Sequence, residues 1–220
     1  MLFDLRSRGR RRTVQVVYLG LAIVFGLGLI LFGVGTGSGG GLLDAFTGNG
    51  SSNSQGSVVS KEEKTAERQT KAHPTDPAAW ASLINARWAS ANGQAQQTTA
   101  GVQYTAKGKQ ELTGTTQAWQ RYRALIKQAD PNLATLAARA YAALGDYGAA
   151  ADAWEADAQA TPNQAKGYAC LALSAYSAKQ TRKGDLAKAK ALALTAKAAR
   201  KQLSTAIDAA KTTPAAAQSC

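Results

Sequence analysis

Apolar and polar positions divide the chain into an apolar run, a polar linker and a long helical part. Residues 13–34 contain no charged side chain in 22 positions. As a helix, a run of that length extends roughly 33 Å, which is enough to cross the hydrocarbon core of a bilayer. We therefore predict a transmembrane helix at residues 13–35.

The charges that flank this run predict its orientation. Residues 1–12 form a basic tail with five arginines and one aspartate, and no basic cluster follows the run closely. The positive-inside rule places the tail in the cytoplasm and the residues after 35 outside it. The chain is thus predicted to be a single-pass plasma-membrane protein. The residues of this topology signal are Arg6, Arg8, Arg10, Arg11 and Arg12.

Other interpretations of the N-terminal segment fit less well. A cleaved signal peptide has a shorter apolar region, of about 7–15 residues, and a small-residue cleavage site. A buried core helix rarely runs this long without a charge, and a basic arm for nucleic acid would not abut an apolar run. Ala22 and Gly26 form a small-xxx-small pair that would let two such helices pack closely, so self-association stays open.

Two segments of different composition follow the apolar run. Residues 36–60 contain seven glycines and six serines, which predicts a flexible linker. Residues 61–75 are charged nearly all round and predict an exposed helical stalk, with Ser60 as N-cap and Glu63 completing a capping box. Pro74 ends this helix, and Asp76-Pro77 starts the next one.

Residues 76–211 predict an all-α domain, and residues 212–220 predict a flexible tail. Alanine and other strong helix formers dominate, while Val/Ile-rich alternating runs are lacking, so no hairpin is predicted. The segment 93–116 is predicted as a helix extension or a polar insertion. The whole chain is therefore expected to be all-α, with one transmembrane helix and one helical domain.

The stretch YAALGDYGAAADAW, residues 141–154, belongs to an internal repeat. Its spacing of a tyrosine, a turn glycine, a tyrosine, a small residue, a large aromatic and a proline resembles the tetratricopeptide repeat family, which has a 34-residue unit. In that pattern the glycine takes the left-handed conformation of a helix C-terminus, and the proline opens the next helix. The residues concerned are Tyr141, Gly145, Tyr147, Ala150, Trp154 and Pro162.

Two weaker copies flank this unit, so the resemblance implies a helical-hairpin solenoid of about three units. In the following copy Tyr168 aligns with Ala134, and the turn is expected at KGDLAKA, five residues later than the repeat requires. The preceding copy begins at Trp80 and returns through Ala118 and Tyr122. The layout resembles that of membrane-anchored bacterial tetratricopeptide proteins at secretion or envelope-assembly machinery.

The resemblance implies a function in binding other proteins. Tetratricopeptide domains hold an extended peptide or a helix in a groove lined by the first helix of each pair. Arg139 and Lys166 would favour an acidic or carboxylate-bearing partner. The expected groove positions are Asn85, Trp88, Thr135, Arg139, Lys166, Ala169, Leu173 and Tyr176.

Catalytic signals are weak, and we expect no enzyme activity, no cofactor and no metal. His73 is the only histidine and lies in a proline-flanked connection. The acids Asp146, Asp152, Glu155 and Asp157 are open to several interpretations: an acid pair, a cation site, a docking patch or, most simply, a solvated face. Cys170 is predicted to be a buried thiol and Cys220 a solvated end, with a bridge between them as the less favoured alternative.

Charge is divided unevenly along the chain. The net charge of +12 combines a basic N-terminus, five acids against one arginine at 130–165, and ten basic residues against two acids at 166–220. This basic C-terminal part suggests an anionic lipid or protein neighbour rather than nucleic acid, given the predicted topology. We expect a membrane-tethered module that binds a partner protein or peptide outside the cytoplasm. The alternative is a structural subunit of a larger membrane complex without a free groove.

Overall fold

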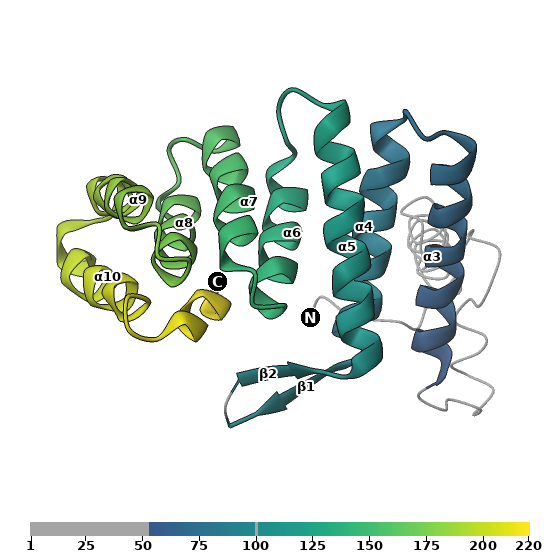
Figure 1. Cartoon of the computed structure of the whole chain (residues 1–220), viewed down its shortest axis with the longest axis horizontal. Helices are drawn as coiled ribbons and strands as arrows, with labels where there is room; N and C mark the ends of the chain where they lie inside the picture. The colour runs from purple at the N-terminus through teal and green to yellow at the C-terminus, as the bar shows by residue number, and fades with distance from the viewer. Residues whose placement is uncertain (1–52, 100) are drawn as a thin grey trace, which may run out of the picture. The chain divides into compact units, whose positions relative to one another are not determined.

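The computed structural model describes residues 53–99 and 101–220, which are mostly helical (Figure 1). The predicted transmembrane helix, the basic tail and most of the linker lie outside these residues. Within the described ranges no helix is both long and apolar enough to cross a membrane. The elements are α3 (Asn53–Ala72), α4 (Pro77–Asn92), β1 (Ala95–Thr98), β2 (Gly101–Tyr104), α5 (Ala106–Leu125), α6 (Pro131–Ala143), α7 (Tyr147–Ala160), α8 (Ala165–Ser177), α9 (Thr181–Leu194), α10 (Lys197–Ala209) and the 3₁₀ helix η1 (Pro214–Ser219).

Consecutive helices pack against one another in order, from α4 through α9. A continuous core of small and aromatic side chains runs between them, and alanines make up much of it. Small residues let helix backbones approach closely, and a few large residues fill the remaining space. Trp154 is the largest fully buried side chain, and Ala150, beside it on α7, is also buried, as expected for repeat packing.

Helices α6–α7 and α8–α9 form two copies of one unit. Pro131 and Ala165, the first residues of α6 and α8, are 34 positions apart, and so are Tyr147 and Thr181, the first residues of α7 and α9. The final residues of the paired helices differ by the same spacing. A 34-residue helical repeat is therefore present in this part of the fold.

The turns inside the two units have the same hydrogen bonds but different residues. After α6, Gly145 adopts φ +82°, and the N–H of Asp146 donates to the carbonyl of Tyr141 at 2.9 Å. After α8, Lys179 takes the same place with φ +61°, and the N–H of Gln180 donates to Ala175 at 2.8 Å. Both are Schellman turns, which need a left-handed residue after the helix.

The second turn corrects the sequence alignment. We expected the turn at KGDLAKA, but it lies at Lys179, 34 positions after Gly145, and Gly184 is inside α9. The sequence did not predict this turn because its left-handed residue is a lysine, and only glycine is a clear sequence signal for that conformation. Gly184 instead gives the close approach that Ala150 gives in the first unit: a Cβ there would lie 2.6 Å from the Tyr176 ring.

The proline at 162 does not open a helix, contrary to expectation. It lies in the exposed loop between α7 and α8, and α8 begins three residues later, at Ala165. Pro77 and Pro131 do occupy first helical positions, where the missing N–H costs nothing. Asp76 and Asp130 cap these two helices by accepting backbone N–H groups.

The predicted stalk is a packed helix and starts earlier than expected. Helix α3 begins at Asn53, so the last residues of the expected linker are helical and Ser60 is not an N-cap. Ala66 and Thr70 are buried, and Arg87 of α4 binds Glu67 at 2.8 Å. The buried face of α3 and this ion pair therefore dock the helix, although most of its other side chains are charged or polar.

The insertion between α4 and α5 is a β-hairpin, which departs from the all-α prediction. β1 and β2 pair antiparallel with Ala95 opposite Tyr104 and Thr98 opposite Gly101. Thr, Val and Tyr favour strands, and Gly101 adopts φ +115° at the turn. Most of the hairpin is exposed, and Val102 is 43% exposed.

The predicted flexible tail is ordered against the helices. Helix α10 packs on α8 and α9, and η1 packs on α8 and α6. Ile207, Ala210 and Ala217 are buried and belong to the continuous core. The chain thus returns across the second repeat unit instead of leaving it.

Candidate functional site

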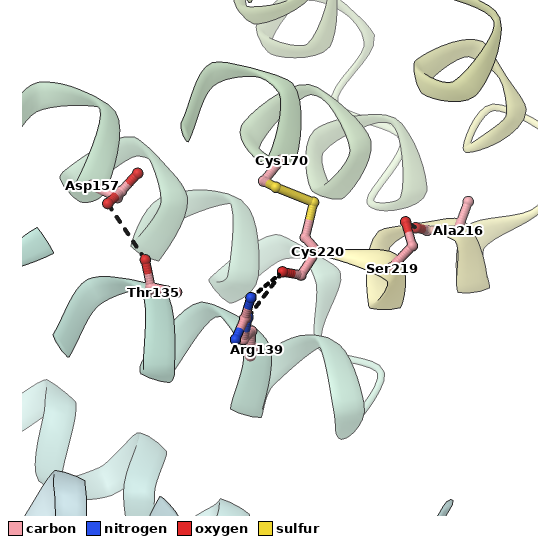
Figure 2. The surroundings of a disulfide bond; sticks show 7 residues. All are labelled: Thr135, Arg139, Asp157, Cys170, Ala216, Ser219 and Cys220. Atoms are coloured by element: carbon pink, nitrogen blue, oxygen red, sulfur yellow. Dashed lines mark hydrogen bonds between the residues drawn. A yellow bond between two sulfur atoms is a disulfide. The ribbon is translucent and has the colours of Figure 1, made fainter. Parts of the chain in front are cut away.

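The C-terminal tail, residues 214–220, lies on one face of α6 and α8 (Figure 2). We define the tail-binding face by Arg139 and Ala142 of α6 and by Cys170 and Ser177 of α8. Arg139 donates from Nε and Nη2 to the main-chain oxygen of Cys220, at 2.9 and 2.7 Å. Ser177 and Ala142 hold the tail further along. Of the predicted groove positions, Arg139 is thus bound by the chain itself.

A disulfide bond joins the tail to α8. Cys170 and Cys220 are bonded, with their Cα atoms 5.8 Å apart and 50 positions between them in sequence. The free buried thiol and the solvated chain end that we expected are both wrong. The bridge, judged the less favoured alternative from sequence, forms because α10 and η1 bring Cys220 back to α8, a return that no local pattern reveals.

Three of the eight expected groove positions are not accessible. Ala169, Leu173 and Tyr176 are buried, because α8 is surrounded by α7, α9, α10 and η1. Asn85 is exposed but lines a hollow between α3 and α4, away from the tail-binding face. The sequence did contain a signal for this burial, because the stretch from 169 to 177 is apolar nearly all round. Every one of these residues is buried in the structure.

Trp88 and Arg139 do come together, in a pocket beside the tail. This pocket, the hairpin pocket, has a volume of about 560 Å³ and lies between α4, β2, α6 and the tail. Val102 and Tyr104 supply its strand side, and Ala217 and Gln218 are among the tail residues that line it. Sequence reasoning missed Val102 and Tyr104, since it did not place a hairpin there.

Tyr104, Arg139 and Trp154 are among the polar residues that line the hairpin pocket. Burial raises the pKa of the Tyr104 hydroxyl, and the charge of Arg139 opposes that rise. The indole N–H of Trp154, which lines the same pocket, is buried and has no acceptor among the described residues. A buried donor without a partner is costly, and because this nitrogen is buried it is not offered to a ligand in the pocket.

Thr135 and Lys166 surround a buried carboxylate instead of lining a groove. Asp157 of α7 is 8% exposed, and Thr135 donates to its Oδ1 at 3.5 Å (Figure 2). Burial raises the pKa of the Asp157 carboxyl, while the Thr135 hydrogen bond and the Lys166 charge lower it. Asp157 therefore belongs to the packing between α7 and α8.

The other acids have structural partners. Asp146 caps α7 by accepting the N–H of Ala149, and Lys183 of α9 binds Asp152 and Glu155 at 2.8 and 2.9 Å. Burial lowers the pKa of Lys183, but the two hydrogen bonds to the acids outweigh it and raise the pKa. In the described ranges, no group of three or more His, Cys, Asp or Glu residues could hold a metal ion.

A further carboxylate cluster joins α3, α4 and α5. Glu63 lies 3.6 Å from Arg87, and the pKa of Glu63 is raised to about 7. Burial is the main cause, followed by a hydrogen bond and repulsion from Glu111, and Arg87 opposes both. The raised pKa of Glu63 thus reflects its burial beside a second carboxyl group where α3 docks.

Comparison with protein-family models, curated proteins and solved structures finds no match to this chain. The tetratricopeptide resemblance therefore remains a prediction from the repeat pattern. The 34-residue spacing of α6–α7 and α8–α9 agrees with it, and the hairpin and the tail are features that the pattern does not contain.

Proposed function

We propose that the chain is a membrane-tethered protein-interaction module that binds a segment of a partner protein in the hairpin pocket. The observation that carries this proposal is the convergence of Trp88, Tyr104 and Arg139 on one accessible pocket. Aromatic residues and arginine dominate the binding energy of protein interfaces. We infer binding rather than catalysis, with no cofactor and no nucleic acid.

The chemistry of the pocket favours a partner segment that carries carbonyl or carboxylate groups. The tail illustrates this chemistry, since Arg139 already takes a main-chain oxygen. The Tyr104 hydroxyl adds a second donor at the same pocket. Val102 adds an exposed apolar contact on the strand side.

Placement outside the cytoplasm is the second part of the proposal. Disulfides persist in secreted, periplasmic and cell-surface proteins and are rare in the cytosol. The Cys170–Cys220 bond therefore supports the orientation that the N-terminal arginines predict. A membrane-tethered helical-repeat domain in that compartment suits recruitment at secretion or envelope-assembly machinery.

A structural subunit is the second candidate, and one observation favours it. The buried positions of α8 and the self-occupied tail-binding face leave no continuous groove along the helices. In that case the helices would pack against fixed neighbours in a larger membrane complex. The two candidates differ in whether the hairpin pocket itself is contacted.

Photo-crosslinking in intact cells tests the binding function. A photoreactive residue at Val102 should form an adduct with a partner protein, because the side chain is exposed at the pocket. The matched control places the same residue at Lys64, on the exposed side of α3. Adding Tyr104→Ala should weaken the Val102 adduct at least several-fold. Equal adducts at both positions, or none at Val102, would refute binding in the pocket.

A further inference from the structure

The tail is held on its face as a ligand would be, through its main chain. Ser177 Oγ donates to the carbonyl of Pro214 at 2.8 Å, and Arg139 donates twice to the main-chain oxygen of Cys220. Gln218 donates back to the carbonyl of Ala142 at 3.3 Å. These contacts would serve any segment of similar shape, because they do not depend on large side chains.

Apolar burial contributes little to the binding of the tail. Ala215, Ala216 and Ala217 are its central residues, and only Ala217 is almost fully buried, at 1% exposure. Burying single methyl groups removes little apolar area from water, and a 3₁₀ helix has poorer hydrogen bonds than an α-helix. Besides the two charge-assisted hydrogen bonds from Arg139, the disulfide bond is the covalent constraint that keeps the tail in place.

We propose that the tail, residues 214–220, is a redox-released latch that covers the tail-binding face until the Cys170–Cys220 bond is reduced. Once released, the face extends the hairpin pocket along α6 and α8, and it accepts a small-residue segment of a partner through main-chain carbonyls. This inference rests on the proposed binding function, because the latch has a purpose only if a partner uses the pocket.

The release step is a thiol–disulfide exchange with a protein or small-molecule dithiol. The dithiol's thiolate attacks Sγ of Cys220, which is partly exposed, whereas Cys170 is 4% exposed. The S–S bond breaks, Cys170 leaves as a thiolate and takes a proton from water, and a mixed disulfide forms at Cys220. The second thiol of the dithiol then attacks this mixed disulfide. Cys220 is released as a thiol, and the dithiol becomes a cyclic disulfide after a two-electron exchange.

Release frees the tail but not the helix that carries it. Ile207 and Ala210 at the end of α10 are fully buried, and Lys188 pairs with Asp208. These contacts do not involve the disulfide, so α10 should stay packed after reduction. The latch is thus limited to the last residues of the chain, and the repeat units keep their fold.

Hydrogen exchange of the full chain in detergent micelles tests the latch. The oxidised protein is compared with the dithiothreitol-reduced protein and with Cys220→Ser, which removes the bond without reductant. We expect amide exchange in residues 215–220 to rise at least about tenfold in both latch-free forms. Exchange in α4, α5 and α10 should stay unchanged. A tail that stays protected after reduction, or exchange that rises across all helices, would overturn the latch.

The Val102 crosslink in the oxidised and reduced states separates this proposal from the binding function. Tail release with a stronger adduct in the reduced chain supports both. A protected tail with equal adducts in both states overturns the latch and leaves the binding function standing. Tail release without an adduct in either state refutes the binding function, and with it the partner that the freed face was proposed to accept.

Discussion

At the scale of single residues, the two repeat turns show how one conformation is met by two residue types. Gly145 accepts the left-handed geometry without a steric cost, while Lys179 adopts it with a Cβ. For a residue other than glycine that geometry is unfavourable by roughly 1 kcal/mol or more. The fold therefore retains a local strain at Lys179, which other interactions offset.

Substitution at these turns should change stability in opposite directions. Lys179→Gly should raise the free energy of unfolding by roughly 0.5–1 kcal/mol, because glycine relieves the left-handed strain. Gly145→Ala should lower it by a similar amount. Urea denaturation followed by circular dichroism measures both. If Lys179→Gly destabilised the fold, its weak 3.4 Å contact with the carbonyl of Lys211 would outweigh the strain.

Residue-level reasoning from sequence selected some residues that line the hairpin pocket and missed others for physical reasons. Trp88 and Arg139 were chosen as groove residues, and both line the hairpin pocket. Leu173 and Tyr176 were chosen in the same way but are buried, since a helix periodicity does not reveal how many neighbours a helix has. The partner of Cys170 was equally hidden, because pairing depends on a return of the chain from 50 residues away.

At the scale of elements, helix α3 docks through a titrating contact. Glu63, Glu67 and Glu111 surround Arg87, which is a single positive charge among three acids. The raised pKa of Glu63 means that the folded chain holds a proton that the unfolded chain releases. Docking of α3 is therefore favoured by mild acid.

The stability of the folded chain should fall as pH rises from about 4.5 to 7. The pKa of Glu63 is about 7 in the folded chain and near 4.5 in the unfolded chain. Its contribution to the free energy of unfolding is therefore complete below pH 4.5 and is lost as pH rises through about 7. Glu63→Gln should remove about 1–3 kcal/mol of this pH dependence and stabilise the chain at pH 8. Thermal unfolding across that range measures the difference from wild type.

The matched control for this prediction is Glu62→Gln, a neighbour on the exposed side of α3. That change should leave the slope of stability against pH as it is in the wild type. If Glu63→Gln also preserved the wild-type slope, the proton that the folded chain retains would not be at Glu63, and the acid-favoured docking of α3 would be wrong.

Elements differ in how far the sequence predicts them. Asp-Pro pairs predicted the starts of α4 and α6, because a capping carboxylate and a proline at the first helical position are signals within two adjacent residues. The hairpin of β1 and β2 was missed because its strands are short, polar and exposed, so they lack the alternation that marks a half-buried strand. The start of α3 was missed because the glycines and serines at its beginning predict a linker.

At the scale of the whole molecule, one covalent bond fixes the end of the chain to the repeat units. The bond closes a loop that contains α8, α9, α10 and η1. In the chain-entropy model a loop of this length stabilises the folded state by roughly 4 kcal/mol. Most of the continuous core from α4 to α9 is made of other side chains, with Cys170 as one member.

Replacing both cysteines should therefore lower stability without unfolding the protein. Cys170→Ala with Cys220→Ala should lower the free energy of unfolding by about 3–4 kcal/mol, because the unfolded chain regains its freedom. Helical circular dichroism at 25 °C should stay at the wild-type level. Loss of that signal would show that the core depends on the bond, and the limited release proposed for the tail would then be wrong.

The most direct test of the covered, extracytoplasmic binding face is thiol trapping in intact cells. Acid quenching followed by alkylation should find no free thiol in the wild-type chain. After a brief pulse of reductant, a membrane-impermeant alkylating agent should label Cys220, and Cys220→Ser should lose that label. Two free thiols before reduction would contradict the bridged tail. Labelling only by a membrane-permeant agent would contradict the proposed compartment.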